Sequence, residues 1–178
     1  MPRNWDEHYL NPADLDFTPG PLLGQVVETV APGRALDLAC GHGRNSLYLA
    51  SLGWQVTAVD RSEPAIRILR DRAAGLSIDA RVADLERGEF TIEPEAYDLI
   101  VDFFYLQRDL FPAIRAGVRV GGIFAGAIHL YEEGRHRCFS VASGELRKLF
   151  EDWKILYYSE ALEPGRTRRS ARLLARRA

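Results

Sequence analysis

The chain has 178 residues, 25 of them acidic and 23 basic, which gives a formal net charge of −2. The length favours one domain over residues 1–178 with a single hydrophobic core. A hydrophobic fraction of 47% beside a charged fraction of 27% excludes a disordered or collagen-like chain, and two cysteines, Cys40 and Cys138, provide neither a zinc ligand set nor a disulfide framework.

Neither a membrane nor a nucleic acid is predicted as a partner. The longest apolar stretches, Leu99–Leu106 and Ile123–Leu130, fall far short of the ~20 residues needed to cross a bilayer. The first ten residues contain two acids and lack the apolar segment of a signal peptide. Six arginines lie between Arg166 and Arg177, so the preceding residues carry a net charge of −8, which disfavours nucleic-acid binding. We therefore expect a cytoplasmic protein.

Helix and strand patterns alternate through the first half of the chain. Residues 1–20, with three prolines, are predicted to form an N-terminal arm with one short helix, placed where it could cover a functional site. Apolar residues at helical spacing predict a helix that Pro32-Gly33 ends. The next predicted elements are a strand at Ala35–Ala39, a helix at Arg44–Leu52, a strand at Trp54–Asp60 and a helix from Ser62 to Ala74.

The second half continues the alternation and then changes to a hairpin. Its predicted elements are strands at Ile78–Asp84, Tyr97–Phe104 and Ile123–Leu130, helices at Asp109–Val118 and Gly144–Asp152, and two last strands at Lys154–Ser159 and Arg169–Arg176 joined by a turn at Pro164-Gly165. Alternation implies βαβ units around a parallel sheet, whereas strands without a helix between them must be antiparallel. The predicted fold is an α/β three-layer sandwich with a mostly parallel, seven-stranded Rossmann-like sheet and a C-terminal antiparallel hairpin.

Acidic residues and glycines gather at the predicted carboxyl ends of the strands, where ligands of such sheets bind. Gly41 and Gly43 allow the backbone to approach a ligand closely, and the helix that follows directs its free N–H groups toward the same space. Asp60 follows Gly41 by 19 residues, the spacing at which a second-strand acid accepts hydrogen bonds from ribose hydroxyls.

The glycine pair and the ribose acid are compatible with two ligands, a dinucleotide and S-adenosylmethionine. The turn Cys40-Gly41-His42-Gly43 lacks the G-x-G-x-x-G spacing of a pyrophosphate cradle. Asp37 would repel a pyrophosphate but suits the ammonium and sulfonium groups of S-adenosylmethionine. A nicotinamide-dependent reductase and a non-catalytic S-adenosylmethionine-binding protein remain alternatives, as does a purely structural role for the turn.

The segment LDLACGHGRNSLYLASLGWQVTAVD resembles the first motif of class I S-adenosylmethionine-dependent methyltransferases. Trp5-Asp6-Glu7-His8-Tyr9 is similar to their N-terminal arm motif, and Ala83-Asp84-Leu85 to their adenine-binding segment. More narrowly, GRNSLYLA, Gly144-Glu145-Leu146-Arg147 and the ending Leu173-Leu174-Ala175-Arg176-Arg177 are similar to the tellurite-resistance (TehB-like) methyltransferases.

This resemblance implies methyl transfer from S-adenosyl-L-methionine to a small-molecule acceptor, and it implies a set of cofactor-binding residues. They are Asp37, Cys40, Gly41, Gly43, Asn45, Asp60, Arg61, Asp84, Leu85, Asp102 and Phe103. Within this set the resemblance assigns the ribose to Asp60, the adenine amino group to Asp84 and the methionine ammonium to Asp102. Two residues depart from the family pattern: Ala39 replaces a glycine, and Asp102 replaces a small hydroxyl residue.

Methyl transfer needs alignment of donor and acceptor more than acid–base chemistry, and no metal-ligand spacing is visible. If the acceptor must lose a proton, His129 at the end of the fifth strand is the candidate general base; the alternative is a strand-end histidine bonded to backbone. Aromatic residues that could wall the cleft are Trp5, Tyr9, Phe103, Phe104 and Tyr105.

Arginines near the end of the chain favour an anionic acceptor. The candidates are Arg135 and Arg137 beside His136, and Arg166, Arg168 and Arg169 in the terminal hairpin. Guanidinium groups bind carboxylates and oxyanions in bidentate fashion, so the acceptor class predicted is an oxyanion, or a thiol or chalcogen compound if the narrower resemblance holds. The alternative is a neutral, apolar acceptor packed on Phe103 and Tyr105.

Overall fold

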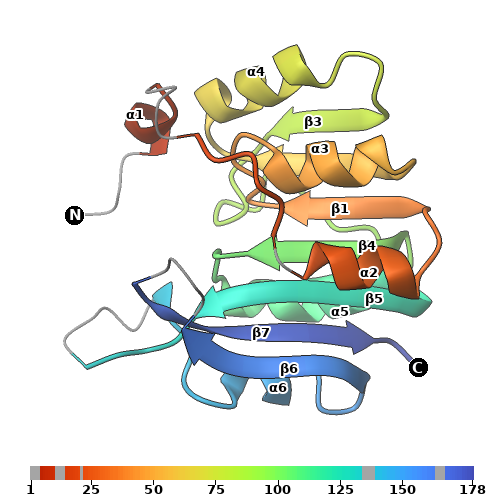
Figure 1. The fold of residues 1–178 in the computed structure, drawn as a ribbon, viewed down its shortest axis with the longest axis vertical. Helices are drawn as coiled ribbons and strands as arrows, with labels where there is room; N and C mark the ends of the chain where they lie inside the picture. The colour runs from red at the N-terminus through yellow and green to blue at the C-terminus, as the bar shows by residue number, and fades with distance from the viewer. Residues whose placement is uncertain (1–4, 11–14, 21, 134–138, 163–166) are drawn as a thin grey trace.

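A seven-stranded mixed sheet forms the centre of the molecule. The computed structural model describes residues 5–10, 15–20, 22–133, 139–162 and 167–178, so Cys138 and the turn predicted at Pro164-Gly165 lie outside the described residues. The strand order is β3-β2-β1-β4-β5-β7-β6 (Figure 1). The strands are β1 (Arg34–Leu38), β2 (Gln55–Asp60), β3 (Ile78–Val82), β4 (Tyr97–Phe103), β5 (Val118–His129), β6 (Lys154–Leu162) and β7 (Arg169–Arg176).

The strand directions confirm the predicted fold class. β3, β2, β1, β4 and β5 are mutually parallel, whereas β7 is antiparallel to both of its neighbours, β5 and β6. The strand order reverses at β1, whose neighbours β2 and β4 continue in opposite directions across the sheet. In a sheet of this kind, the crevice at such a switch is where ligands bind.

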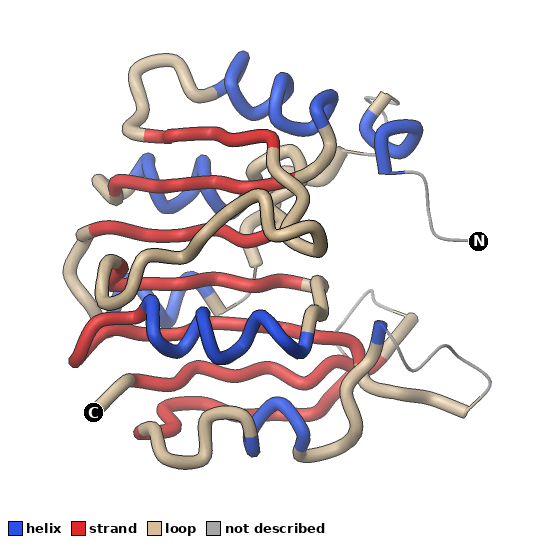
Figure 2. The backbone as a smooth tube through the Cα atoms, turned by 180° about the vertical axis from the view of Figure 1, so that it is seen from behind, coloured by secondary structure: helices blue, strands red, loops and turns tan. Residues whose placement is uncertain are grey.

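Helices cover both faces of the sheet and complete the three layers. One face carries α2 (Leu23–Thr29), α3 (Arg44–Ser51) and α4 (Glu63–Arg72), and the other carries α5 (Phe111–Gly117) and the single turn α6 (Glu145–Lys148), as Figures 1 and 2 show. A short 3₁₀ helix, η2 (Arg108–Leu110), precedes α5, and α1 (Trp5–Tyr9) lies beyond the carboxyl ends of the parallel strands (Figure 1).

Two hydrophobic clusters hold the layers together, one on each side of the sheet. β4 is buried along its whole length because both of its faces are covered. Phe124 and Phe150 stack at 4.4 Å between ring centroids on the α5 side. Between β3 and β4, where no helix intervenes, the connecting segment supplies Leu85 and Ile92 to the same cluster (Figure 2). Within the described part of the chain, no helix is long and apolar enough to cross a membrane.

Most predicted elements are confirmed, and three boundaries differ by three or more residues. β5 begins at Val118, five residues before the predicted Ile123, because Gly121 at φ +79° lets the strand continue through a bulge opposite Tyr97 and Leu99. The predicted helix at 144–152 is a single helical turn followed by further turns. β6 extends three residues beyond the predicted end because its partner β7 continues the hydrogen-bonded ladder.

Candidate functional site

The turn between β1 and α3 has an unusual backbone. Ala39, Gly41 and Gly43 all have positive φ angles, +49°, +57° and +82°. A side chain at Gly43 would collide with Leu69, which explains the glycine there. Ala39 holds a left-handed conformation that L-residues adopt only at a cost. The backbone at Ala39, which stands where the family pattern has a glycine, is therefore strained. The turn keeps its shape despite the Ala39 methyl group.

Asp37 lies beneath this turn, with about 1% of its surface exposed. The Ser46 hydroxyl, in the first turn of α3, donates a 2.5 Å hydrogen bond to Asp37 Oδ2. Burial raises the pKa of the Asp37 carboxyl to about 7, against the opposing effects of Ser46 and of the Arg44 charge. The carboxyl is thus poised to ionise when a positive group arrives.

Asp60 joins the end of β2 to the glycine turn. Its Oδ2 accepts a 2.8 Å hydrogen bond from the Gly41 backbone N–H, and its Oδ1 accepts one of 2.8 Å from Ser62. Ser62 in turn caps α4, because its hydroxyl accepts from the Ala65 N–H. Burial raises the pKa of Asp60 above its ordinary value, and the two backbone donors oppose that rise. Gly41 and Asp60, 19 positions apart in the sequence, are therefore in direct contact.

Asp102 is the penultimate residue of β4, which lies on the other side of β1 from β2, and it has about 1% of its surface exposed. The Tyr105 backbone N–H donates to its carboxyl, whereas its Oδ1 has no hydrogen-bond partner. Burial, together with the nearby Asp37 charge, raises the pKa of Asp102 well above its ordinary value. A buried, unpartnered carboxyl oxygen costs free energy unless a ligand satisfies it.

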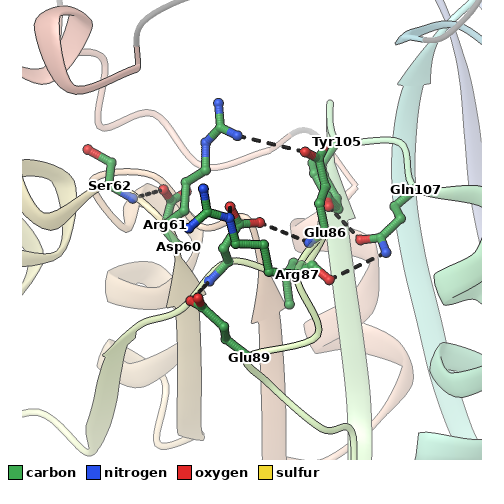
Figure 3. A network of polar contacts seen from close by, with 10 residues as sticks. Asp60, Arg61, Ser62, Glu86, Arg87, Glu89, Tyr105 and Gln107 are labelled. Atoms are coloured by element: carbon green, nitrogen blue, oxygen red, sulfur yellow. Dashed lines mark hydrogen bonds and ion pairs between the residues drawn. The ribbon is translucent and has the colours of Figure 1, made fainter.

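A cavity of about 350 Å³ opens at Arg61, the residue after Asp60. Its lining residues come from the arm and from the ends of β2 and β3: Trp5, Asp6, Arg61, Val82, Asp84, Arg87 and Glu89. Asp84 Oδ1 accepts from the Glu86 N–H at 2.9 Å, and Arg61 lies 3.8 Å from the Glu86 carboxylate (Figure 3). Two residues of the predicted cofactor-binding set, Arg61 and Asp84, therefore line one cavity.

Leu85 is connected to the segment after β4 through Gln107, to which the sequence analysis assigned no role, and Tyr105, which it assigned to the wall of the cleft. The Leu85 carbonyl accepts a 3.4 Å hydrogen bond from the Gln107 side chain, and the Tyr105 hydroxyl donates to Gln107 Oε1 at 2.6 Å (Figure 3). Leu85 itself belongs to the hydrophobic core. No local sequence pattern marks Gln107, since its role depends on a segment 22 residues away.

Two other residues of the predicted cofactor-binding set, Asn45 and Cys40, are buried within the protein. The Asn45 carboxamide oxygen accepts a buried 2.8 Å hydrogen bond from the Gly20 N–H of the arm. Burial raises the pKa of the Cys40 thiol well above its ordinary value, so this residue is a neutral thiol within the turn. We did not predict the contact between Asn45 and Gly20 from the sequence, although a glycine after Pro19 is typical of an extended segment that packs closely.

Phe103 and His129 are the last residues of the neighbouring strands β4 and β5. The Phe103 ring packs so closely on Gly20 that a Cβ there would lie 2.6 Å from it. His129 ends β5, and its ring lies 4.8 Å from the Phe104 ring between centroids. Phe104 has a φ of +67°, a conformation that is rare for a bulky residue and common at functional sites.

The residues present fit S-adenosylmethionine better than a dinucleotide. A positive charge would stabilise the ionised forms of the buried Asp37 and Asp102 carboxyls, and a ligand donor could satisfy the unpartnered Asp102 Oδ1; S-adenosylmethionine carries positive charge on its ammonium and sulfonium groups. A pyrophosphate would place further negative charge beside them. Asp60 accepts two backbone hydrogen bonds, and carboxylate oxygens have further lone pairs for ribose hydroxyls.

Comparison with solved structures identifies the class of fold. The crystal structure of TehB from Haemophilus influenzae matches with a TM-score of 0.78 and 26% sequence identity, and the match covers 98% of this chain and 66% of that chain. The chain therefore has the Rossmann-like fold of S-adenosylmethionine-dependent methyltransferases.

Sequence comparisons identify the family. The family model of the tellurite resistance protein TehB matches residues 7–171. The chain is 33% identical over 153 residues to a probable S-adenosyl-L-methionine-dependent methyltransferase TehB of Haemophilus influenzae, a match that covers 77% of this chain and 52% of the relative. It is 35% identical over 151 residues to a protein named hemagglutinin 1 of Eikenella corrodens, a match that covers 79% of this chain and 50% of the relative.

The chain belongs to the TehB family. It spans about half the length of the curated relatives it matches.

Proposed function

We propose that the chain binds S-adenosyl-L-methionine at the carboxyl edge of β1, β2 and β4 and transfers its methyl group to a small-molecule acceptor. The observation that carries the proposal is the pair of buried carboxyls on neighbouring strands, Asp37 of β1 and Asp102 of β4. Their raised pKa values and the unpartnered Asp102 Oδ1 are costly for the free protein and are relieved by a cationic ligand.

The residues divide the cofactor between three parts of the site. Asp37 and Asp102 would hold the methionine end, Asp60 the ribose, and Asp84 with the Leu85 backbone the adenine. S-adenosylmethionine supplies an electrophilic methyl group on its sulfonium. What the chain supplies is alignment, since in-line transfer depends on the fixed positions of donor and acceptor.

We propose an oxyanion, a thiol or a chalcogen compound as the acceptor class. Of the arginines predicted to bind it, Arg135, Arg137 and Arg166 lie outside the described residues, as does His136. Arg168 donates to the Ser140 hydroxyl at 3.1 Å, and Arg169 to the Glu160 carbonyl at 3.2 Å. The name of the family, tellurite resistance, supports a chalcogen oxyanion as the first acceptor to test.

Two titrations test the cofactor proposal. Calorimetry with S-adenosylmethionine and, separately, with NADH should give a saturable signal with S-adenosylmethionine alone. The reverse result would favour the reductase alternative. Formation of S-adenosylhomocysteine is then followed across oxyanions, thiols and neutral phenols. Binding without turnover on any acceptor would support a non-catalytic S-adenosylmethionine-binding protein.

A further inference from the structure

The N-terminal arm lies across the glycine turn in two pieces. The first is α1, whose Tyr9 hydroxyl packs directly against Gly41. The second is the extended segment 15–20, which runs over the start of α3 toward α2 (Figure 1). Gly20, at the end of this segment, packs against Phe103. The arm therefore contacts three of the residues predicted to bind the cofactor, Gly41, Phe103 and Asn45.

His42, between the two glycines, contacts both pieces of the arm. Its Nε2 lies 2.9 Å from the Asp16 carbonyl oxygen, so Nε2 must carry a proton and donate it. The imidazole ring meets the Phe17 ring edge-on at 4.6 Å between centroids and the Tyr9 ring at 5.8 Å. The Arg72 guanidinium from α4 lies 3.9 Å from the centre of the Phe17 ring. His42 is the residue of the turn at which these contacts converge.

The next residues of the chain hold the arm at alternate positions. The Arg44 guanidinium lies 3.9 Å from the Asp16 carboxylate and donates to the Thr18 carbonyl at 3.4 Å. Asn45 accepts from the Gly20 N–H at 2.8 Å, in a buried position. Contacts at residues 16, 18 and 20 have the period of two that an extended chain presents to one side. The start of α3 thus receives the arm as a strand-like segment.

We infer that His42 is a positioning residue that latches the N-terminal arm over the glycine turn, so that arm docking and cofactor binding form one coupled equilibrium. The inference rests on the proposed function, because the ligand that binds more tightly when the arm is docked is S-adenosylmethionine or its product. The latch works by two separable contacts, the N–H donated to Asp16 and the ring packed between Phe17 and Tyr9. By linkage, a ligand that binds better under the docked arm must also stabilise its docking.

Three substitutions separate the two contacts. His42→Gln keeps a side-chain N–H donor and removes the ring, His42→Phe keeps a ring and removes the donor, and His42→Ala removes both. Calorimetry should show that His42→Ala binds S-adenosylhomocysteine about tenfold more weakly than the unmodified chain, the factor that one neutral hydrogen bond is worth. His42→Gln and His42→Phe should fall between them. Glu28→Ala, an exposed position on α2, is the control and should bind normally.

The Gly20 amide reports on docking directly, because its only described acceptor is Asn45. Hydrogen exchange at this amide, followed by NMR, should be about tenfold faster in His42→Ala than in the unmodified chain, and S-adenosylhomocysteine should slow it in the unmodified chain. Unchanged exchange and unchanged affinity in His42→Ala would overturn the latch. If His42→Ala does not fold, the same comparison is made with His42→Gln.

Failure of the proposed function gives a different result. In that case the unmodified chain itself binds no S-adenosylmethionine or S-adenosylhomocysteine, whereas Gly20 exchange without ligand still reports whether His42 holds the arm. If the unmodified chain binds the ligand and Gly20 exchange does not respond to it, the cofactor proposal stands and the coupling is wrong.

Discussion

The Ser46 hydroxyl donates a 2.5 Å hydrogen bond to Asp37 Oδ2 beneath the glycine turn, and this is the closest polar contact described for that carboxyl. The hydrogen bonds from the Ser46 hydroxyl and backbone N–H do not compensate for full burial, so the pKa of Asp37 stands at about 7. The site therefore holds a carboxylic acid that releases its proton near neutral pH.

We expect this carboxyl to make the free protein less stable as pH rises. The folded state keeps the Asp37 proton up to about pH 7, whereas an unfolded aspartate loses it near pH 4. The folded state thus binds more protons between these values, and the free energy of unfolding falls across the window. Urea unfolding of Asp37→Asn, which still accepts from Ser46, should lack this fall. Relative to the unmodified chain, the variant should gain roughly 2–4 kcal/mol between pH 4.5 and pH 8.

Cofactor affinity should have the opposite pH dependence. A cationic ligand favours the ionised carboxyl, so S-adenosylmethionine should bind more tightly as pH rises from 6 to 8, with release of protons. Calorimetry in buffers of different ionisation enthalpy measures that release. Asp37→Asn should bind more weakly and with a flatter pH profile. A pH-independent affinity in the unmodified chain would contradict a role for Asp37 at the cationic end of the ligand.

Removal of the Asp60 carboxylate should weaken S-adenosylmethionine binding by about 1.5–3 kcal/mol, the range for a hydrogen bond to a charged group. Asp60→Ala also frees the Gly41 and Ser62 N–H groups, which would add a structural loss. Asp60→Asn is the matched variant, because its one carbonyl oxygen retains part of this network. Unchanged affinity in a folded Asp60→Ala protein would exclude the ribose role.

Ala39→Gly should stabilise the chain. Relief of the left-handed strain contributes about 1–2 kcal/mol, and the greater freedom of glycine in the unfolded chain offsets about 0.4–1 kcal/mol of it. The net expectation is a gain of about 0.5–1 kcal/mol in the free energy of unfolding, measured by urea denaturation. Ala74→Gly, in the loop after α4, carries no positive φ and should lose stability. If Ala39→Gly also lowers the free energy of unfolding, other contacts already compensate for the backbone strain at Ala39.

The fold was predictable because its information is local and periodic. A continuous apolar run predicts a strand buried on both faces, as β4 is, and Ser62 marks the start of α4. The wrong boundary of β5 arises from Gly121, which reads as a stop along the chain but lies in a bulge of the sheet. Whether a glycine ends or bends an element depends on the neighbouring strand.

Contacts within the site that follow from a fixed spacing in the sequence were predictable. Contacts that depend on the packing of distant segments were not. The interval between Gly41 and Asp60 indicated that the two residues belong to one site, and the structure brings them into hydrogen-bond contact; the ribose role of Asp60 stays a prediction. Asn45 was predicted beside the ligand, yet its carboxamide holds Gly20, which is 25 residues away in the sequence. The positive φ of Phe104 has no sequence signal either, because no glycine or asparagine marks it.

The contact between Phe104 and His129 gives the last prediction, which concerns catalysis. If His129 removes a proton from the acceptor, His129→Gln should lower kcat by about 10²–10⁴-fold and leave S-adenosylmethionine affinity unchanged. Phe104→Leu keeps an apolar side chain but loses the ring contact of 4.8 Å, so it should lower kcat by about 3–10-fold. Phe139 is exposed, so Phe139→Leu serves as the control and should not change kcat.

The double variant decides how Phe104 acts. If Phe104 only orients the imidazole, the Phe104→Leu and His129→Gln changes combined should be no slower than His129→Gln alone. Additive losses would show that Phe104 contacts the acceptor itself, and full activity in His129→Gln would exclude the general-base role.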